Sequence, residues 1–153
     1  MQSIHDLTLE SFLPLQRMSE LAASGHSVYQ QAKPFPHIVI DNFFDPQLLE
    51  LILQEFPRPG QIAWQRFDNE REIKLASAAE GNFGPVTRLL LYHLNGMTFL
   101  QFLSSVTGID NLLPDPGFEG GGLHQIVRGG KLGIHADFNK HKKYNLDRRL
   151  NLL

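Results

Sequence analysis

Residues Gly121–Leu153 read GGLHQIVRGGKLGIHADFNKHKKYNLDRRLNLL, and this stretch decides how the whole chain is interpreted. The run on both sides of the triplet His135-Ala136-Asp137 is typical of a β-strand, in which side chains two residues apart point to the same face. His135 and Asp137 are therefore predicted to share one face. The opposite face is wholly apolar and consists of Leu132, Ile134, Ala136 and Phe138. An imidazole and a carboxylate side by side suit two ligands of one metal ion.

The pair Gly129-Gly130 predicts a two-residue hairpin turn between the strand-like runs on either side of it. Counting outward from this turn places His124 opposite His135. His124 is then a candidate to line the pocket and contact substrate, with a plain structural role as the alternative. After the triplet, 138–147 is polar and basic and is predicted to be a loop. Residues 148–153 are predicted to begin another strand, with three residues on one side: Arg149, Asn151 and Leu153.

Two motifs in this stretch, GGKLGIHADFN and RRLNLL, together resemble the iron-binding core of the prolyl-hydroxylase-like 2-oxoglutarate/Fe(II) oxygenases. An earlier segment, PFPHIVIDNFFDPQLLELI at Pro34–Ile52, resembles the strand and helix that lead into that core. The resemblance implies an α+β fold in which N-terminal helices brace a double-stranded β-helix, the jelly-roll of cupin-like proteins. It assigns 1–120 to a supporting region and 121–153 to the first strands of the jelly-roll, within one domain.

The same resemblance implies a metal centre and a reaction. His135 and Asp137 would bind Fe(II), and a second histidine would complete a 2-His-1-carboxylate facial triad. Asn151 and Leu153 stand where family members point residues toward 2-oxoglutarate. The implied activity is a dioxygenase reaction that couples decarboxylation of 2-oxoglutarate to hydroxylation of an unactivated C–H bond, with dioxygen as cosubstrate and ascorbate as reductant. The implied substrate is a prolyl or other side chain of a protein or peptide.

The sequence departs from the family pattern in two ways. The family's second histidine ligand and the arginine that pairs with 2-oxoglutarate lie further downstream than Leu153. The chain is therefore interpreted as the N-terminal portion of an oxygenase, incomplete at the C-terminus and inactive alone. His141 is a poor substitute, because it lies in the basic loop only six residues after His135.

The second departure is at the glycine turn. Prolyl-hydroxylase types often place tyrosines around this turn, where this chain has Ile126 and Leu132. Two alternatives stay open: another cupin-like metal-binding protein, and a non-catalytic truncated fragment.

The composition is that of an ordinary globular domain, with 153 residues, 42% hydrophobic and 20% charged. No cysteine is present, so no disulfide framework exists. The first residues lack the basic and apolar regions of a secretory signal, and no apolar run approaches the length of a membrane span. The sequence predicts a cytoplasmic location without a membrane partner.

Charge is unevenly distributed. Residues 1–120 carry seven Lys and Arg against fourteen Asp and Glu, whereas 121–153 carry seven against two. The basic end could draw in a dicarboxylate cosubstrate or an acidic partner. The favoured alternative is a solvated loop containing Lys140, Lys142 and Lys143. The basic residues lack interleaved aromatic side chains beyond Tyr144, so no nucleic-acid partner is predicted.

Proline, glycine and helix-capping residues, which typically begin or end helices and strands, predict the order of elements upstream of the site. The expected elements are helix over 7–32 with a break near Pro14, strand over 37–41, helix from Asp45-Pro46, one or two strands over 64–77 with a turn at 68–69, helix from Gly84-Pro85, helix over 97–107 and loop over 110–122.

Overall fold

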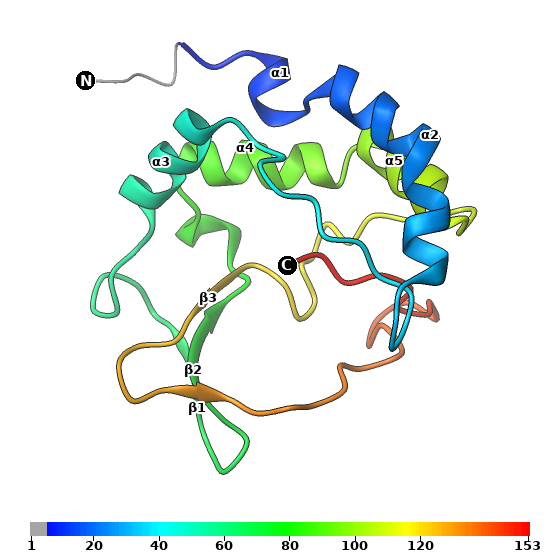
Figure 1. Ribbon diagram of the computed structural model, residues 1–153. Helices are drawn as coiled ribbons and strands as arrows, with labels where there is room; N and C mark the ends of the chain where they lie inside the picture. Colours follow the sequence, from blue (N-terminus) through cyan, green and yellow to red (C-terminus); the bar gives the residue numbers. More distant parts are fainter. Residues whose placement is uncertain (1–5) are drawn as a thin grey trace. The chain divides into compact units, whose positions relative to one another are not determined.

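The computed structural model describes residues 6–153 and contains helices and an open antiparallel sheet. The fold class is α+β, as the sequence predicted. The chain divides into two compact units, each assembled from two separate stretches (Figure 1). The first unit combines 6–56 with 84–116, and the second combines 57–83 with 117–153. No helix within 6–153 is both long and apolar enough to cross a bilayer.

The first unit is helical, and its helix boundaries follow local sequence signals. It contains α1 (Leu9–Phe12), α2 (Leu15–Gln31), α3 (Pro46–Glu55), α4 (Pro85–Leu94) and α5 (Met97–Thr107). Pro14 separates α1 from α2, as predicted. Asp45 caps α3, since its side chain accepts a hydrogen bond from the backbone N–H of Gln47 at 2.8 Å. Gly108 ends α5 with a φ of 72°, in the left-handed region that favours glycine.

Two apolar clusters form the core of this unit. In the first, α2 packs against α5 through Met18, Phe99, Phe102 and Val106. Gly25 of α2 lies against both Val106 of α5 and Ile38, since a Cβ at this position would meet Val106 Cγ1 at 3.5 Å and Ile38 Cδ1 at 3.3 Å. The second cluster is built around Leu48, which α3 places among residues of α1 and α4. The ring of the half-buried His93 lies 5.0 Å from the ring of Phe12, a buried member of the second cluster.

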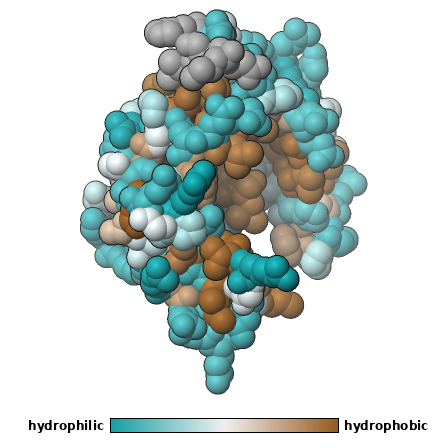
Figure 2. Space-filling model, turned by 90° about the vertical axis from the view of Figure 1, so that its left-hand side faces the viewer, coloured by the Kyte–Doolittle hydropathy of each residue, from teal (hydrophilic) through white to brown (hydrophobic). Residues whose placement is uncertain are grey.

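The helix α3 separates buried from exposed leucines within one turn. Leu48 is 0% exposed, whereas Leu49 is 47% exposed. Apolar side chains such as Leu53 also reach the surface, and apolar atoms lie open among hydrophilic ones in Figure 2. Scattered exposed apolar residues are normal for a folded protein.

A carboxylate joins the end of α3 to the start of α4. Glu55 accepts hydrogen bonds from the backbone N–H of Val86 at 3.2 Å and of Thr87 at 2.6 Å, and from the Thr87 hydroxyl at 2.6 Å. The residue before α4 is Gly84, which has no side chain to cap the helix. Glu55 therefore satisfies N–H groups that lack a partner within α4, and its negative charge lies at the positive end of the helix dipole.

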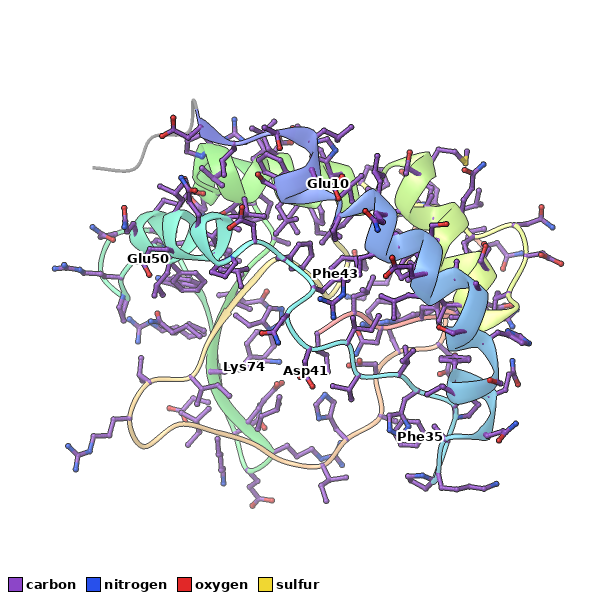
Figure 3. All side chains as sticks on the ribbon, turned by 45° about the horizontal axis from the view of Figure 1, so that its top comes forward. Glu10, Phe35, Asp41, Phe43, Glu50 and Lys74 are labelled. Carbon is purple, nitrogen blue, oxygen red and sulfur yellow. The ribbon has the colours of Figure 1, made fainter. Side chains whose placement is uncertain are left out.

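The strand predicted over 37–41 is not present. Ile38 and Ile40 pack against the first core cluster, while Val39 between them is 76% exposed. Alternate residues of this segment therefore pack against the core, but no strand in the described residues pairs with it. The guanidinium of Arg17 donates to the carbonyls of Asp41 and Asn42 at the far end of this segment. Asp41 is labelled in Figure 3.

The second unit is built on a four-stranded antiparallel sheet with β2 (Glu72–Ser77) at its centre. The other strands are β1 (Gln65–Asp68), β3 (Leu123–Gln125) and β4 (Lys131–Leu132). β1 and β2 pair as a hairpin, so the segment 64–77, predicted to hold one or two strands, holds two. The turn follows Asp68, which is the last residue of β1, and so does not lie at the predicted 68–69. Asn69 shapes its turn, because the side-chain oxygen accepts from the backbone N–H of Arg71 at 2.9 Å and of Glu72 at 3.1 Å.

The predicted hairpin at Gly129-Gly130 is wrong. β3 and β4 do not pair with each other, and both pair with β2 on the edge away from β1. His124 lies opposite Ala76, not opposite His135. The glycines belong to a turn closed by the Gly130 N–H and the Val127 carbonyl at 2.8 Å, with a positive φ of 86° at Gly129. In the predicted hairpin, Gly129 and Gly130 would be the two central residues, with positive φ at Gly129 or at both. The observed turn lies one residue earlier: its central residues are Arg128 and Gly129, and Gly129 takes the second central position with positive φ. The turn lies in the loop 126–130, which connects β3 to β4 along the same edge of β2.

Candidate metal site

The triplet with His135 and Asp137 follows the end of β4 rather than lying in a strand. β4 covers only Lys131–Leu132, and the last backbone contact to the sheet is the Gly133 N–H to the Arg71 carbonyl at 2.7 Å. The strand predicted through the triplet is therefore too long. Ile134 is 107% exposed, so the apolar face that suggested a strand is not buried within the described residues.

The two side chains nevertheless converge, as their spacing predicted. The ring of His135 is held by a hydrogen bond of 2.8 Å between Nδ1 and the Gly133 carbonyl. A carbonyl can only accept, so Nδ1 carries the hydrogen and the lone pair of the neutral ring lies on Nε2. Nε2 lies 3.5 Å from Oδ1 of Asp137. Two ligands with bonds of about 2.0–2.2 Å to one ion are separated by a similar distance. When the ring is protonated, the same contact is an ion pair.

A tight reversal of the chain brings a second group of residues to Asp137. The Arg148 N–H donates to the Asn139 carbonyl at 2.7 Å, Lys140 and Asp147 form an antiparallel bridge, and the His141 N–H donates to the Leu146 carbonyl at 2.9 Å. This turn returns the chain alongside the triplet. The strand predicted over 148–153 is not formed, because the pairing stops at its first residue.

The second oxygen of Asp137 contacts Asn151 and Arg148. The Asn151 amide donates to Oδ2 at 3.0 Å, and Nη2 of Arg148 lies 3.3 Å from the same oxygen. Arg148 also donates to Oδ1 of Asn151 at 2.7 Å, and its guanidinium lies over the Phe138 ring at 4.6 Å. Sequence reasoning missed Arg148. No sequence signal identified it, because its position follows from the reversal of the chain, which places Arg148 directly opposite Asn139.

Two other predicted site residues are not brought to the pair. His124 lies exposed on β3, and its role in a substrate pocket stays a prediction. Leu153 is fully exposed, and its role toward 2-oxoglutarate also stays a prediction. His141 is engaged within its own turn, where Nδ1 accepts from the N–H groups of Lys143 at 3.1 Å and Tyr144 at 3.3 Å.

Two of the three lysines of the basic loop have acidic partners. Lys140 lies 3.1 Å from Asp147, and Lys142 lies 3.1 Å from Glu119. The lysine side chains are largely exposed, so these pairs contribute little stability. Their geometry matches the solvated loop favoured from the sequence.

The described part of the chain offers two converging ligands. Among residues 6–153, no three His, Cys, Asp or Glu side chains lie close enough together to hold a metal ion. The pair itself fits an ion that accepts one nitrogen and one oxygen, because the imidazole tautomer and the carboxylate orientation are both fixed by neighbouring hydrogen bonds. Comparison with protein-family models, with curated proteins and with solved structures finds no match to this chain.

Proposed function

We propose that this chain carries part of the active site of a 2-oxoglutarate- and Fe(II)-dependent dioxygenase, which hydroxylates an unactivated C–H bond of a prolyl or other protein side chain. The observation that carries the proposal is the approach of His135 Nε2 to Asp137 Oδ1 at 3.5 Å, with Nδ1 already occupied by the Gly133 carbonyl. The proposal includes a jelly-roll to which the open sheet contributes strands, and a cytoplasmic location.

In this proposal, His135 and Asp137 hold Fe(II). Fe(II) bound there would activate dioxygen, which is the oxidant, and 2-oxoglutarate would be oxidised to succinate and carbon dioxide as the substrate is hydroxylated. The residues of the chain orient its ligands: the Gly133 carbonyl fixes the imidazole ring, and Asn151 and Arg148 fix the carboxylate. Asn151 lies 3.0 Å from Oδ2 of Asp137, close enough to the pair to contact a 2-oxo acid held beside it. Leu153 toward 2-oxoglutarate and His124 toward substrate remain part of the proposal.

Removal of either ligand should weaken metal binding. We expect His135→Ala and Asp137→Ala each to raise the dissociation constant for Co²⁺ at least about tenfold, since only two ligands hold the ion. Co²⁺ serves as an air-stable probe, and its visible absorption reports the titration. His37→Ala is the matched control, because Nδ1 of His37 also bonds the carbonyl two residues earlier, at 2.9 Å, but no carboxylate contact accompanies it. Equal weakening by His37→Ala, or none by His135→Ala, would remove the basis of the proposal.

Turnover should need more ligands than the described residues bring together. We expect the 153-residue chain to release no succinate from 2-oxoglutarate in the presence of Fe(II) and ascorbate, because two protein ligands hold iron weakly and the guanidinium of Arg148 is already bound to Asp137 and Asn151. A chain extended by a segment carrying a further histidine and arginine should release succinate.

Either half of the turnover test can contradict the proposal. Succinate from the 153-residue chain would show that His124, His141 or another residue completes the site. Metal binding without succinate from the extended chain would favour another kind of cupin-like metal protein.

A further inference from the structure

The strand β1 leaves one edge of the sheet open. Within the described residues it pairs only with β2, whereas β3 and β4 lie on the far edge of β2. The Asn69 N–H donates to the Glu72 carbonyl at 3.0 Å where the two strands meet the turn. Backbone groups alternate in direction along an antiparallel strand, so those of Phe67 also point to β2, while those of Arg66 and Asp68 point away from the sheet. The open edge therefore presents N–H and C=O groups of two residues to a further strand.

The side chains along this edge carry opposite charges. Arg66 and Asp68 are exposed, and they share one face of the sheet because they are two residues apart. Among residues 6–153, neither side chain has an ionic partner. Phe67 lies between them on the other face, where it is half-buried and its ring centroid is 5.1 Å from Nζ of Lys74. The edge thus presents a cation, an aromatic ring and an anion in sequence.

We infer that two copies of this chain pair antiparallel along β1, with Phe67 opposite its own counterpart. In this register Arg66 of each copy lies opposite Asp68 of the other, so opposite charges meet at both ends of the pair. The outward N–H and C=O groups of these two residues then bond each other across the new contact. A pairing centred on Arg66 or on Asp68 would instead place like charges directly opposite each other, which is destabilising.

The interface is small and requires no metal or cosubstrate, so the inference is independent of the proposed function. β1 has only four residues, and the contact is far smaller than that of a standard stable complex. We therefore expect a weak, reversible dimer that dissociates as added salt screens the charge pairs. The alternative is that the charges of this short strand keep the edge from pairing at all, as charged edge residues do in many proteins.

Sedimentation equilibrium of the whole chain over a range of concentrations tests the inference. Arg66→Asp and Asp68→Arg should each raise the dissociation constant for self-association at least about tenfold, because like charges then lie opposite each other. An equimolar mixture of the two variants should dimerise again, because the two carboxylates of one chain then face the two guanidiniums of the other. A monomer at every concentration of the unmodified chain, or a mixture that stays monomeric, would overturn the inference.

Arg128→Asp is the matched control. It makes the same charge change at an exposed residue of the loop 126–130, along the opposite edge of β2. It should change the dissociation constant by less than about twofold, because a distant exposed charge is screened by solvent and salt. An equal weakening by Arg128→Asp and Arg66→Asp would show an effect of net charge alone and would overturn the inference.

A disulfide cross-link tests the register separately. The chain has no cysteine, so Phe67→Cys introduces a single thiol. In the inferred register this thiol lies opposite its own counterpart, with the two Cα atoms about 4.5 Å apart, within the range of a disulfide. In Gln65→Cys, the new thiol lies opposite Asn69 of the second copy, so oxidation should give covalent dimers at least about tenfold more slowly than in Phe67→Cys. Equal rates for the two variants would overturn the inference. The cross-link also decides the result if circular dichroism shows that either charge variant is unfolded.

Discussion

Leu48→Ala should lower the free energy of unfolding by about 3–5 kcal/mol, because Leu48 is fully buried and the smaller side chain leaves a cavity. The lost contacts belong to the second core cluster, where Leu48 lies with Phe12 and Val86. Typical domains have only about 5–15 kcal/mol of stability in total, so the helical unit should become marginal. Urea denaturation followed by circular dichroism at the helical wavelength measures the change.

Leu49→Ala is the control on the same helix. Leu49 is 47% exposed, so its truncation should cost less than about 1 kcal/mol. Equal losses for the two leucines would contradict the assignment of the buried face of α3.

Gly122→Ala should destabilise the sheet unit by about 3 kcal/mol, because alanine is strained at the observed backbone conformation and has no room there. The φ of Gly122 is 92°. A Cβ would lie 2.4 Å from the Ser77 carbonyl oxygen and 3.0 Å from Cα of Ala78. Both are backbone atoms of the segment that pairs with β3, so neither can move without loosening the pair between Ser77 and Leu123. Loss of strand signal in circular dichroism and an earlier thermal transition are expected.

The adjacent glycine provides the comparison. Gly121 has no positive φ, and a Cβ there would meet its nearest neighbour at 3.6 Å, an ordinary contact. Gly121→Ala should therefore change the free energy of unfolding by less than about 1 kcal/mol. If both variants lose stability equally, the close approach of Gly122 to Ser77 is not the cause.

The helices were predictable because their ends are fixed by neighbouring residues. Pro14, Asp45 and Gly108 each act within one turn of the backbone, through a missing N–H, a side-chain cap and a positive φ. Strand partners could not be predicted in the same way. The Gly129-Gly130 pair fits both a hairpin turn and a turn inside a loop, and only the long-range pairing of β3 and β4 with β2 decides between them.

The candidate site was likewise predictable where it depends on neighbouring residues, and not where it depends on the path of the chain. His135 and Asp137 converge because residues two apart lie on one side of any extended chain, whether or not a strand forms. The sequence interpretation assigned Asn151 to the cosubstrate, and the structure places its amide on the carboxylate of Asp137. Arg148 was missed because its approach depends on a reversal of the chain, which hydrophobic periodicity does not encode.

The reversal at 139–148 has a consequence for evolutionary change in chain length. It is closed at its base by the bond between Arg148 and Asn139, next to the residues that meet Asp137. Residues added or removed at the tip, beyond the Lys140–Asp147 bridge, would change the number of residues between Asp137 and Arg148. They would not change the distance between these two side chains, which lie at the base of the reversal. The number of residues between Asp137 and Arg148 can thus change in descendants of this chain, while the geometry around the Asp137 carboxylate is retained.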